Sequence, residues 1–103
     1  MKIIERDVMR VLPGKMAEAM ELSREEMTVY NSLGINPSVK RYVPFTGSVD
    51  RLHTIITDTD LGSFASIEAA MKKAQASPEM QEIFAKWQAI IVDHILELYM
   101  VED

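Results

Sequence analysis

The spacing of apolar and polar residues changes several times along the chain, and each change marks a predicted element boundary. Residues 3–12 mix apolar and charged side chains and are rich in β-branched residues, which predicts a strand. The segment Pro13-Gly14-Lys15 ends this strand. A helix is then predicted from apolar residues at helical spacing, namely Met16, Met20, Met27 and Tyr30. Gly34 is expected just beyond its end.

The second half of the chain predicts a hairpin, a broken helix and a last strand. Residues 38–44 and 51–59 are rich in β-branched residues and flank a turn at 46–48, which predicts two paired strands. A helix is expected after Ser63, with one apolar face made of Phe64, Ile67, Met71 and Ala74. Ser77-Pro78 restarts it, with Met80, Phe84 and Trp87 on one side. Residues 94–101 predict the last strand.

The predicted order is β-α-β-β-α-β, with the second helix broken near Ser77. This order is typical of the ferredoxin-like α+β fold, in which a four-stranded antiparallel sheet carries its helices on one face. The length of 103 residues suits one domain, so we expect a single ferredoxin-like domain over residues 1–103.

Alternation along the last strand predicts which side of the sheet faces the helices. Leu96, Leu98 and Met100 form a uniformly apolar side, which we assign to the helices. The other side mixes apolar residues with Glu97, and no strand shows the clean polar face of a sheet exposed to water. We therefore expect a homodimer that packs sheet against sheet. The alternative is a monomer with a few exposed apolar side chains.

Composition and charge exclude several classes of function. The formal net charge is −5 and there is no basic cluster, so we expect neither nucleic acid nor an anionic membrane as a partner. The chain has no cysteine, which excludes disulfides and thiolate chemistry. Its first residues are too charged for a signal peptide and no apolar run is long enough to span a membrane, so we expect a cytoplasmic protein.

Three segments of the chain resemble a known superfamily. They are VLPGKMAEAMEL, YVPFTGSVDRLHTII and SFASIEAAMKKAQASPEMQEIFAKW, which carry the PGK before the first helix, the TG…R turn and the break at ASPEMQ. Together they resemble the dimeric α/β-barrel superfamily, and most of all its NIPSNAP-like members, over nearly the whole chain. The resemblance implies a ferredoxin-like protomer, a dimer, and a ligand cavity between helices and sheet.

The resemblance leaves the activity open. The superfamily includes cofactor-independent monooxygenases of antibiotic biosynthesis, haem-degrading monooxygenases, muconolactone isomerase-like enzymes and members without known activity. Haem-degrading relatives use an Asn, a Trp and a His together. Here Trp87 and His94 are only seven positions apart, and neither Asn31 nor Asn36 lies in the first strand, so this set is not reproduced.

The stretch from Phe45 to Asp60 carries a histidine and three aspartates, yet it does not predict a metal site. His53 and Asp58 have opposite parity along the strand, and His53 and Asp60 lie too far apart to share one ion. We expect Asp58 and Asp60 to end the strand, and we expect no metal and no cofactor. His53 is kept as a candidate general base, because its pKa lies near working pH.

Aromatic and charged residues supply the remaining candidates. Three aromatic residues are predicted to line a ligand cavity, namely Tyr42, Trp87 and Tyr99. His94 is a weaker candidate, because Asp93 and His94 point to opposite faces of a strand and so form no dyad. Charged residues within the mixed-face strands are expected to form structural ion pairs, with ligand contact as the alternative, and they are Glu5, Asp7, Arg41 and Glu97.

The sequence therefore supports three hypotheses for function. The first is a homodimeric protein of unassigned activity that binds a small apolar ligand. The second is a cofactor-independent monooxygenase or isomerase that acts on a small cyclic or aromatic substrate, with His53 as base. The third is an assembly module, which would have no cavity. A cavity beside His53 would favour the second hypothesis over the others.

Overall fold

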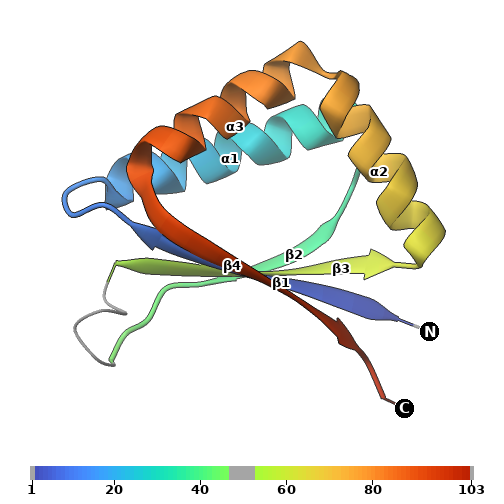
Figure 1. Ribbon diagram of the computed structural model, residues 1–103, viewed down its shortest axis with the longest axis horizontal. Coiled ribbons are helices and arrows are strands. Elements are labelled where there is room, and N and C mark those ends of the chain that lie inside the picture. The colour runs from blue at the N-terminus through green and yellow to red at the C-terminus, as the bar shows by residue number, and fades with distance from the viewer. Residues whose placement is uncertain (1, 47–52, 103) are drawn as a thin grey trace.

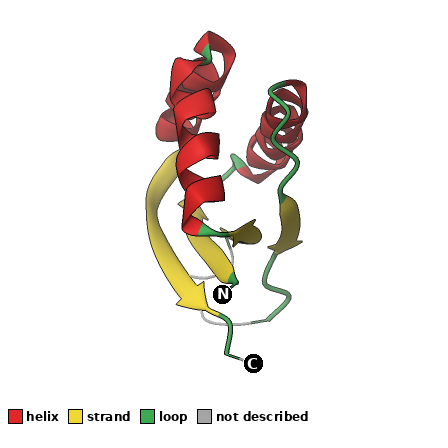
Figure 2. Ribbon diagram, turned by 90° about the vertical axis from the view of Figure 1, so that its right-hand side faces the viewer, coloured by secondary structure: helices red, strands yellow, loops and turns green. Residues whose placement is uncertain are grey.

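The computed structural model describes residues 2–46 and 53–102, and its elements follow the predicted order. They are β1 (Ile3–Val11), α1 (Met16–Ser32), β2 (Ser38–Tyr42), β3 (Thr54–Gly62), α2 (Phe64–Ala76), α3 (Pro78–Ile90) and β4 (Ile91–Met100). The strands form one antiparallel sheet in the order β2-β3-β1-β4. Figures 1 and 2 show the helices on a single side of this sheet, as the ferredoxin-like prediction requires.

Three predicted strand boundaries were wrong by three residues each. The third strand begins at Thr54 and runs on to Gly62, so Asp58 and Asp60 lie inside β3 and do not end it. β4 begins at Ile91, directly after α3. Most of the predicted hairpin turn at 46–48 lies outside the described residues, which leaves that prediction open.

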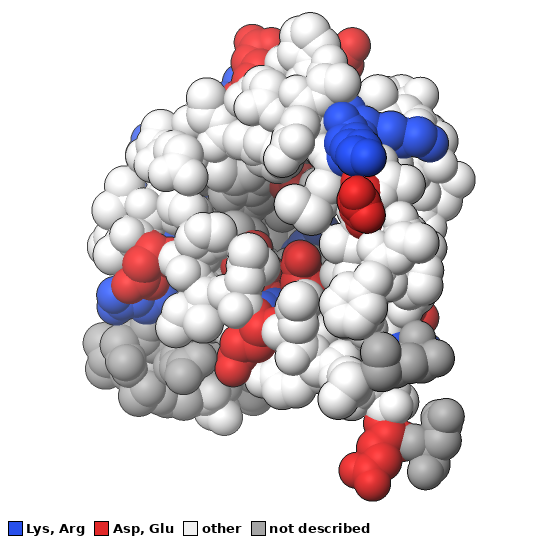
Figure 3. All heavy atoms as spheres, turned by 45° about the vertical axis from the view of Figure 1, so that its right-hand side comes forward, with Lys and Arg blue, Asp and Glu red and all other residues white. Residues whose placement is uncertain are grey.

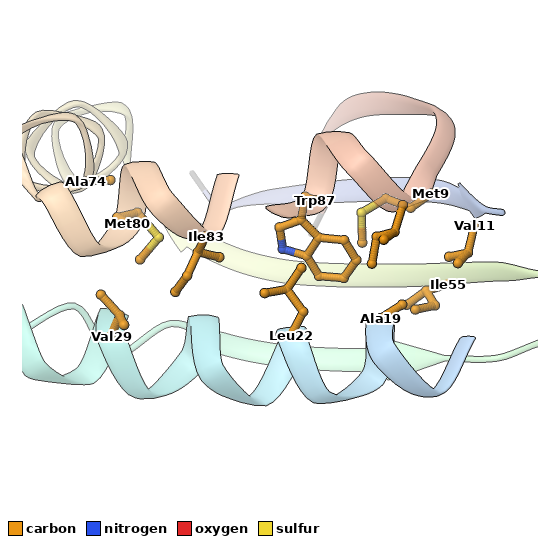
Figure 4. Close-up of a cluster of buried hydrophobic side chains, with 11 residues drawn as sticks. Met9, Val11, Ala19, Leu22, Val29, Ile55, Ala74, Met80, Ile83 and Trp87 are labelled. Carbon is orange, nitrogen blue, oxygen red and sulfur yellow. The ribbon is translucent and has the colours of Figure 1, made fainter. Parts of the chain in front are cut away.

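The core lies between α1, α3 and the sheet. Figure 4 shows Trp87 of α3 and Leu22 of α1 pointing toward each other, with Met9 of β1 beside them. The buried side of α1 also holds Ala19 and Val29, whereas the methionines that predicted this helix are only partly buried. The predicted face of α1 therefore differs from the observed one, whose most deeply buried residue is Ala19.

The helix boundaries follow from local chemistry. Gly34 adopts a φ of +76° just after α1, a left-handed conformation that favours glycine, as the sequence predicted. At the break between α2 and α3, the hydroxyl of Ser77 accepts a hydrogen bond of 3.2 Å from the backbone N–H of Met80. Pro78 then occupies the first turn of α3, where its missing N–H costs nothing.

The side of the sheet away from the helices, here called the outer face, carries ion pairs between neighbouring strands. Nε and Nη2 of Arg6 each donate a hydrogen bond to one carboxylate oxygen of Asp58, at 2.7 and 2.8 Å. Arg10 binds Asp93 in the same bidentate way. Among residues 2–46 and 53–102, no helix is both long and apolar enough to cross a membrane.

Candidate functional site

A cavity of about 540 Å³ lies between the helices and the sheet. Figure 3 shows a hollow on this side of the molecule with acidic atoms inside it. The walls are mostly apolar, and α2 supplies part of them through Ile67, Ala70 and Met71. Phe84 and Trp87 of α3 contribute two aromatic rings. A volume of this size, with apolar walls and few polar groups, is typical of a small-molecule site.

The register of the sheet brings polar side chains to the cavity floor. Arg41 of β2 pairs with Thr57 of β3, and Thr57 pairs with Asp7 of β1, so the three stand side by side across the sheet. In the next row Glu5 of β1 stands beside Thr59 of β3. All five residues line the cavity, because alternate residues of each strand point to the same face.

One helix adds a third carboxyl group opposite this floor. Glu26 of α1 accepts a hydrogen bond of 2.6 Å from the indole N–H of Trp87, and both residues line the cavity. Burial raises the pKa of Glu26, while the hydrogen bond from Trp87 lowers it by a smaller amount. Burial, together with Glu26 and Glu5, raises the pKa of Tyr30 to about 12.

The carboxyl group of Asp7 lies beside an imidazole. Its Oδ1 is 3.4 Å from Nδ1 of His94, which comes from the neighbouring strand β4 and also lines the cavity. Oδ1 is buried and makes no hydrogen bond, and the buried Nε of Arg41 makes none either. Burial raises the pKa of Asp7, and the neighbouring His94 counteracts part of this. Burial and the charge of Asp7 likewise raise the pKa of Glu5.

The residues predicted for the site are divided between the two faces of the molecule. Trp87 lies in the cavity wall. Tyr42 and Tyr99 instead line a second hollow of about 450 Å³ on the outer face, where the guanidinium carbon of Arg6 lies 5.7 Å from the centre of the Tyr99 ring. His53 lies in the turn before β3 with an exposed side chain, away from both hollows. Its position gives no support to a role as base.

Most of the polar residues of the cavity were not predicted from the sequence to line a ligand site. Glu26 was not predicted to belong to the site. It lies one helical turn after the buried Ser23 and one turn before the partly buried Tyr30, and this spacing indicates that it shares their face of α1. Glu5, Asp7 and Arg41 were expected in structural ion pairs, but they face the helices and line the cavity. The sequence could not show this, because both faces of β1 and of β2 carry charged residues, and their alternation does not say which face is covered.

The described part of the chain contains no group of three or more His, Asp or Glu side chains arranged to hold a metal ion. The carboxyl groups of the cavity can accept hydrogen bonds, carry charge and transfer protons. Buried ionisable groups with raised pKa values often occur at ligand and catalytic sites, and here they lie in the cavity between the helices and the sheet.

No protein-family model matches this chain, and no curated protein does. Solved structures do match it. A NIPSNAP family protein from Agrobacterium tumefaciens has a TM-score of 0.83 and 20% identity, covering 100% of this chain and 95% of its own. A NIPSNAP domain protein from Burkholderia xenovorans has a TM-score of 0.79 and 11% identity, covering 97% and 94%.

An antibiotic biosynthesis monooxygenase of known structure is also similar, with a TM-score of 0.70, 9% identity, and coverage of 98% of this chain and 99% of its own. At such identities the likeness concerns the fold. The chain has the fold of the NIPSNAP family proteins and of the antibiotic biosynthesis monooxygenases, as its sequence resemblance predicted.

Proposed function

We propose that this protein binds a small, mainly apolar molecule in the cavity between its helices and its sheet. The observation that carries the proposal is the cavity itself, about 540 Å³ in volume with largely apolar walls and a few polar groups at its floor. A concave space of this volume, lined mainly by apolar side chains with a few polar groups, is the usual form of a small-molecule site.

The single tryptophan of the chain lies in the cavity wall and provides the measurement. A neutral cage alcohol, adamantylmethanol, is titrated into the protein while the fluorescence of Trp87 is followed. We expect saturable binding, because the cage fills apolar space and its hydroxyl can reach the polar floor.

Two variants on α2 test whether binding occurs in the cavity. Ala70 lines the cavity, whereas its neighbour Ala69 is exposed and does not. Ala70→Phe should fill part of the space and weaken binding strongly, and Ala69→Phe should leave it unchanged. Equal binding by the two variants, or no binding by the unsubstituted protein, would refute the proposal.

A second candidate function is an enzyme that moves a proton on a cyclic or aromatic substrate, either an isomerase or a cofactor-independent monooxygenase. The favouring observation is the pair formed by Asp7 and His94, 3.4 Å apart at the cavity wall. Such a pair could take a proton from carbon beside a carbonyl group and return it elsewhere, which is an isomerisation. In a monooxygenase it would deprotonate a phenol that dioxygen then oxidises.

Hydrogen exchange provides a general test of the enzymatic candidate. Cyclic ketones are incubated with the protein in deuterium oxide, and loss of the proton signals beside the carbonyl is followed by NMR. We expect accelerated exchange that Asp7→Asn abolishes while binding of adamantylmethanol persists. Exchange at the uncatalysed rate for every ketone, together with no oxygen uptake with phenols, would remove this candidate.

We also propose that the protein acts as a homodimer through the outer face of the sheet. Four large side chains on or next to this face are substantially exposed, namely Ile95 and Tyr99 of β4, Val101 just after β4, and Tyr42 of β2. Burying these side chains against a second copy would remove apolar surface from water. Light scattering coupled to size-exclusion chromatography tests the mass directly.

A cytoplasmic location remains a prediction from the sequence.

A further inference from the structure

The cavity is lined by more negative than positive ionisable groups. Glu5 and Asp7 of β1 and Glu26 of α1 are carboxylic acids, and Arg41 of β2 is the guanidinium group among the described lining residues. His94 of β4 and Tyr30 of α1 complete the ionisable set, since the described lining residues of β3, α2 and α3 carry none. The described lining residues thus carry three carboxyl groups and one guanidinium group, so acidic groups outnumber permanently cationic ones.

Two polar atoms among these groups are buried without a hydrogen bond in the described part of the chain. The buried Oδ1 of Asp7 and the buried Nε of Arg41 both lack a hydrogen-bond partner within the described residues. A buried acceptor without a donor costs free energy, and it is normally satisfied by protein, water or ligand. The cavity therefore offers an incoming molecule an acceptor on β1, whose contact with Nδ1 of His94 is long at 3.4 Å, and a donor on β2 without a hydrogen-bond partner in the described ranges.

The walls around these carboxyl groups suit an organic cation. The rings of Phe84, Trp87 and Tyr30 all line the same cavity. Aromatic faces attract ammonium groups through the charge distribution of the ring, more strongly where water is excluded. Carboxyl groups and aromatic rings in one cavity favour a ligand with a positive head and an apolar body.

We propose that the cavity selects an apolar amine, whose ammonium group is received by Glu5, Asp7 and Glu26 and whose body lies against the apolar walls. This inference rests on the proposed function, because it names the ligand class of the same cavity. A hydrogen-bond acceptor elsewhere on the ligand would meet the unpaired Nε of Arg41. The chemistry required is one protonated amine on a compact apolar frame.

Binding of such a ligand is linked to proton release. Burial raises the pKa values of Glu5, Asp7 and Glu26, so part of this group keeps its protons at a pH where exposed carboxyl groups are ionised. A bound ammonium group stabilises the ionised form of these carboxyl groups. Binding of the amine should therefore release their protons to the solvent. Affinity should rise as pH rises through the raised pKa values, until the amine itself loses its proton near pH ~10.

The test uses three probes with one body and different heads, namely adamantylmethylamine, adamantylmethanol and adamantane carboxylate. Each is titrated into the full-length protein by calorimetry in two buffers of different ionisation enthalpy. We expect the amine to bind about tenfold more tightly than the alcohol, because charge-assisted hydrogen bonds are stronger than neutral ones. The carboxylate should bind most weakly. The difference between the binding enthalpies in the two buffers should show that protons are released when the amine binds and not when the other two probes bind.

Two glutamates on the same helix provide matched variants. Glu26 lines the cavity, whereas Glu25 is exposed and pairs with Lys86 at the surface. Glu26→Gln should weaken amine binding about tenfold while alcohol binding stays within about twofold, because the charge is lost but the shape is kept. Glu25→Gln should change neither. Asp7→Asn provides a second removal of charge if the first variant folds poorly.

The outcomes separate this inference from the proposed function. Alcohol binding that equals or exceeds amine binding, or an amine affinity that both glutamine variants leave unchanged, overturns the amine while the cavity remains a ligand site. Tight binding of the carboxylate overturns it as well. Failure of all three probes to bind overturns the inference and the proposed function together.

Discussion

At the scale of single residues, two sets of carboxyl groups have opposite properties. Burial raises the pKa of Glu26 in the cavity, with Asp7 and Glu5 adding to the effect. On the outer face, hydrogen bonds from Arg6 lower the pKa of Asp58. The cavity groups therefore favour folding most when protonated, and the outer-face groups favour it most when ionised. As pH rises, the cavity groups should therefore lower the free energy of unfolding, and the outer-face groups should raise it.

Glu26→Gln should stabilise the protein at high pH. The pKa of Glu26 is raised in the folded state above its ordinary 4.5, so its favourable contribution is complete below that value and is lost as pH rises through the raised pKa. The variant should gain on the order of 1 kcal/mol in free energy of unfolding at pH 8 and nothing near pH 4. Urea unfolding at both pH values measures this, with Glu25→Gln as the flat control. A less stable variant at pH 8 would contradict it.

Asp58→Asn should show the opposite dependence. The pKa of Asp58 is lowered below its ordinary 3.8 by Arg6, so its contribution is present above 3.8 and is lost as pH falls through the lowered pKa. The variant should be less stable than the unsubstituted protein at pH 7, and this deficit should vanish in strong acid. Thermal unfolding across this pH range provides the measurement. A deficit that persists unchanged in acid would indicate lost packing instead of a lost ion pair.

At the scale of elements, the two halves of the broken helix have different tasks. α3 buries Met80, Ile83, Trp87 and Ile90 against α1 and the sheet, and so it belongs to the core. α2 buries Ala74 alone, and its Phe64 and Met71 are largely exposed. The apolar face that predicted α2 therefore serves mainly as a cavity wall, through Ile67 and Met71, and only Ala74 of that face joins the core. Figure 1 shows α2 turned away from the direction shared by α1 and α3.

The two serine N-caps make this difference measurable. Ser77 and Ser63 each accept a 3.2 Å hydrogen bond from the backbone N–H three residues later, at Met80 and Ser66. Ser77→Ala should lower the free energy of unfolding by about 1 kcal/mol, since it weakens a helix that anchors the core. Ser63→Ala should mainly speed hydrogen exchange within α2. Equal effects on global unfolding would show that α2 is as tightly coupled as α3.

At the scale of the whole molecule, β4 is an edge strand with apolar side chains on both faces. Ile95 on the outer face is 61% exposed and Leu98 on the helix side is 59% exposed, so the two are matched in size and exposure. The proposed dimer covers the outer face. Ile95→Lys should therefore give a monomer by light scattering, whereas Leu98→Lys should remain dimeric. A monomeric unsubstituted protein, or dissociation by the Leu98 variant alone, would place the interface elsewhere.

The order of elements, the break at Ser77 and the left-handed Gly34 could all be predicted from the sequence, because each rests on local spacing or on one residue's backbone preference. Leu96, Leu98 and Met100 were also assigned to the correct side of the sheet, since alternate residues of a strand share one face and these three are uniformly apolar. The start of β3 was wrong because β-propensity does not mark where pairing begins.

The site depended on contacts between residues distant in the chain. Asp7 meets His94 across two strands, and Glu26 meets Trp87 across two helices, at separations that no local pattern encodes. The sequence by itself determined the elements, their order and the chemistry available, because local preferences depend on near neighbours. Only the tertiary structure decided which charged residues left water for the cavity, because burial is a property of the packed sheet and helices together.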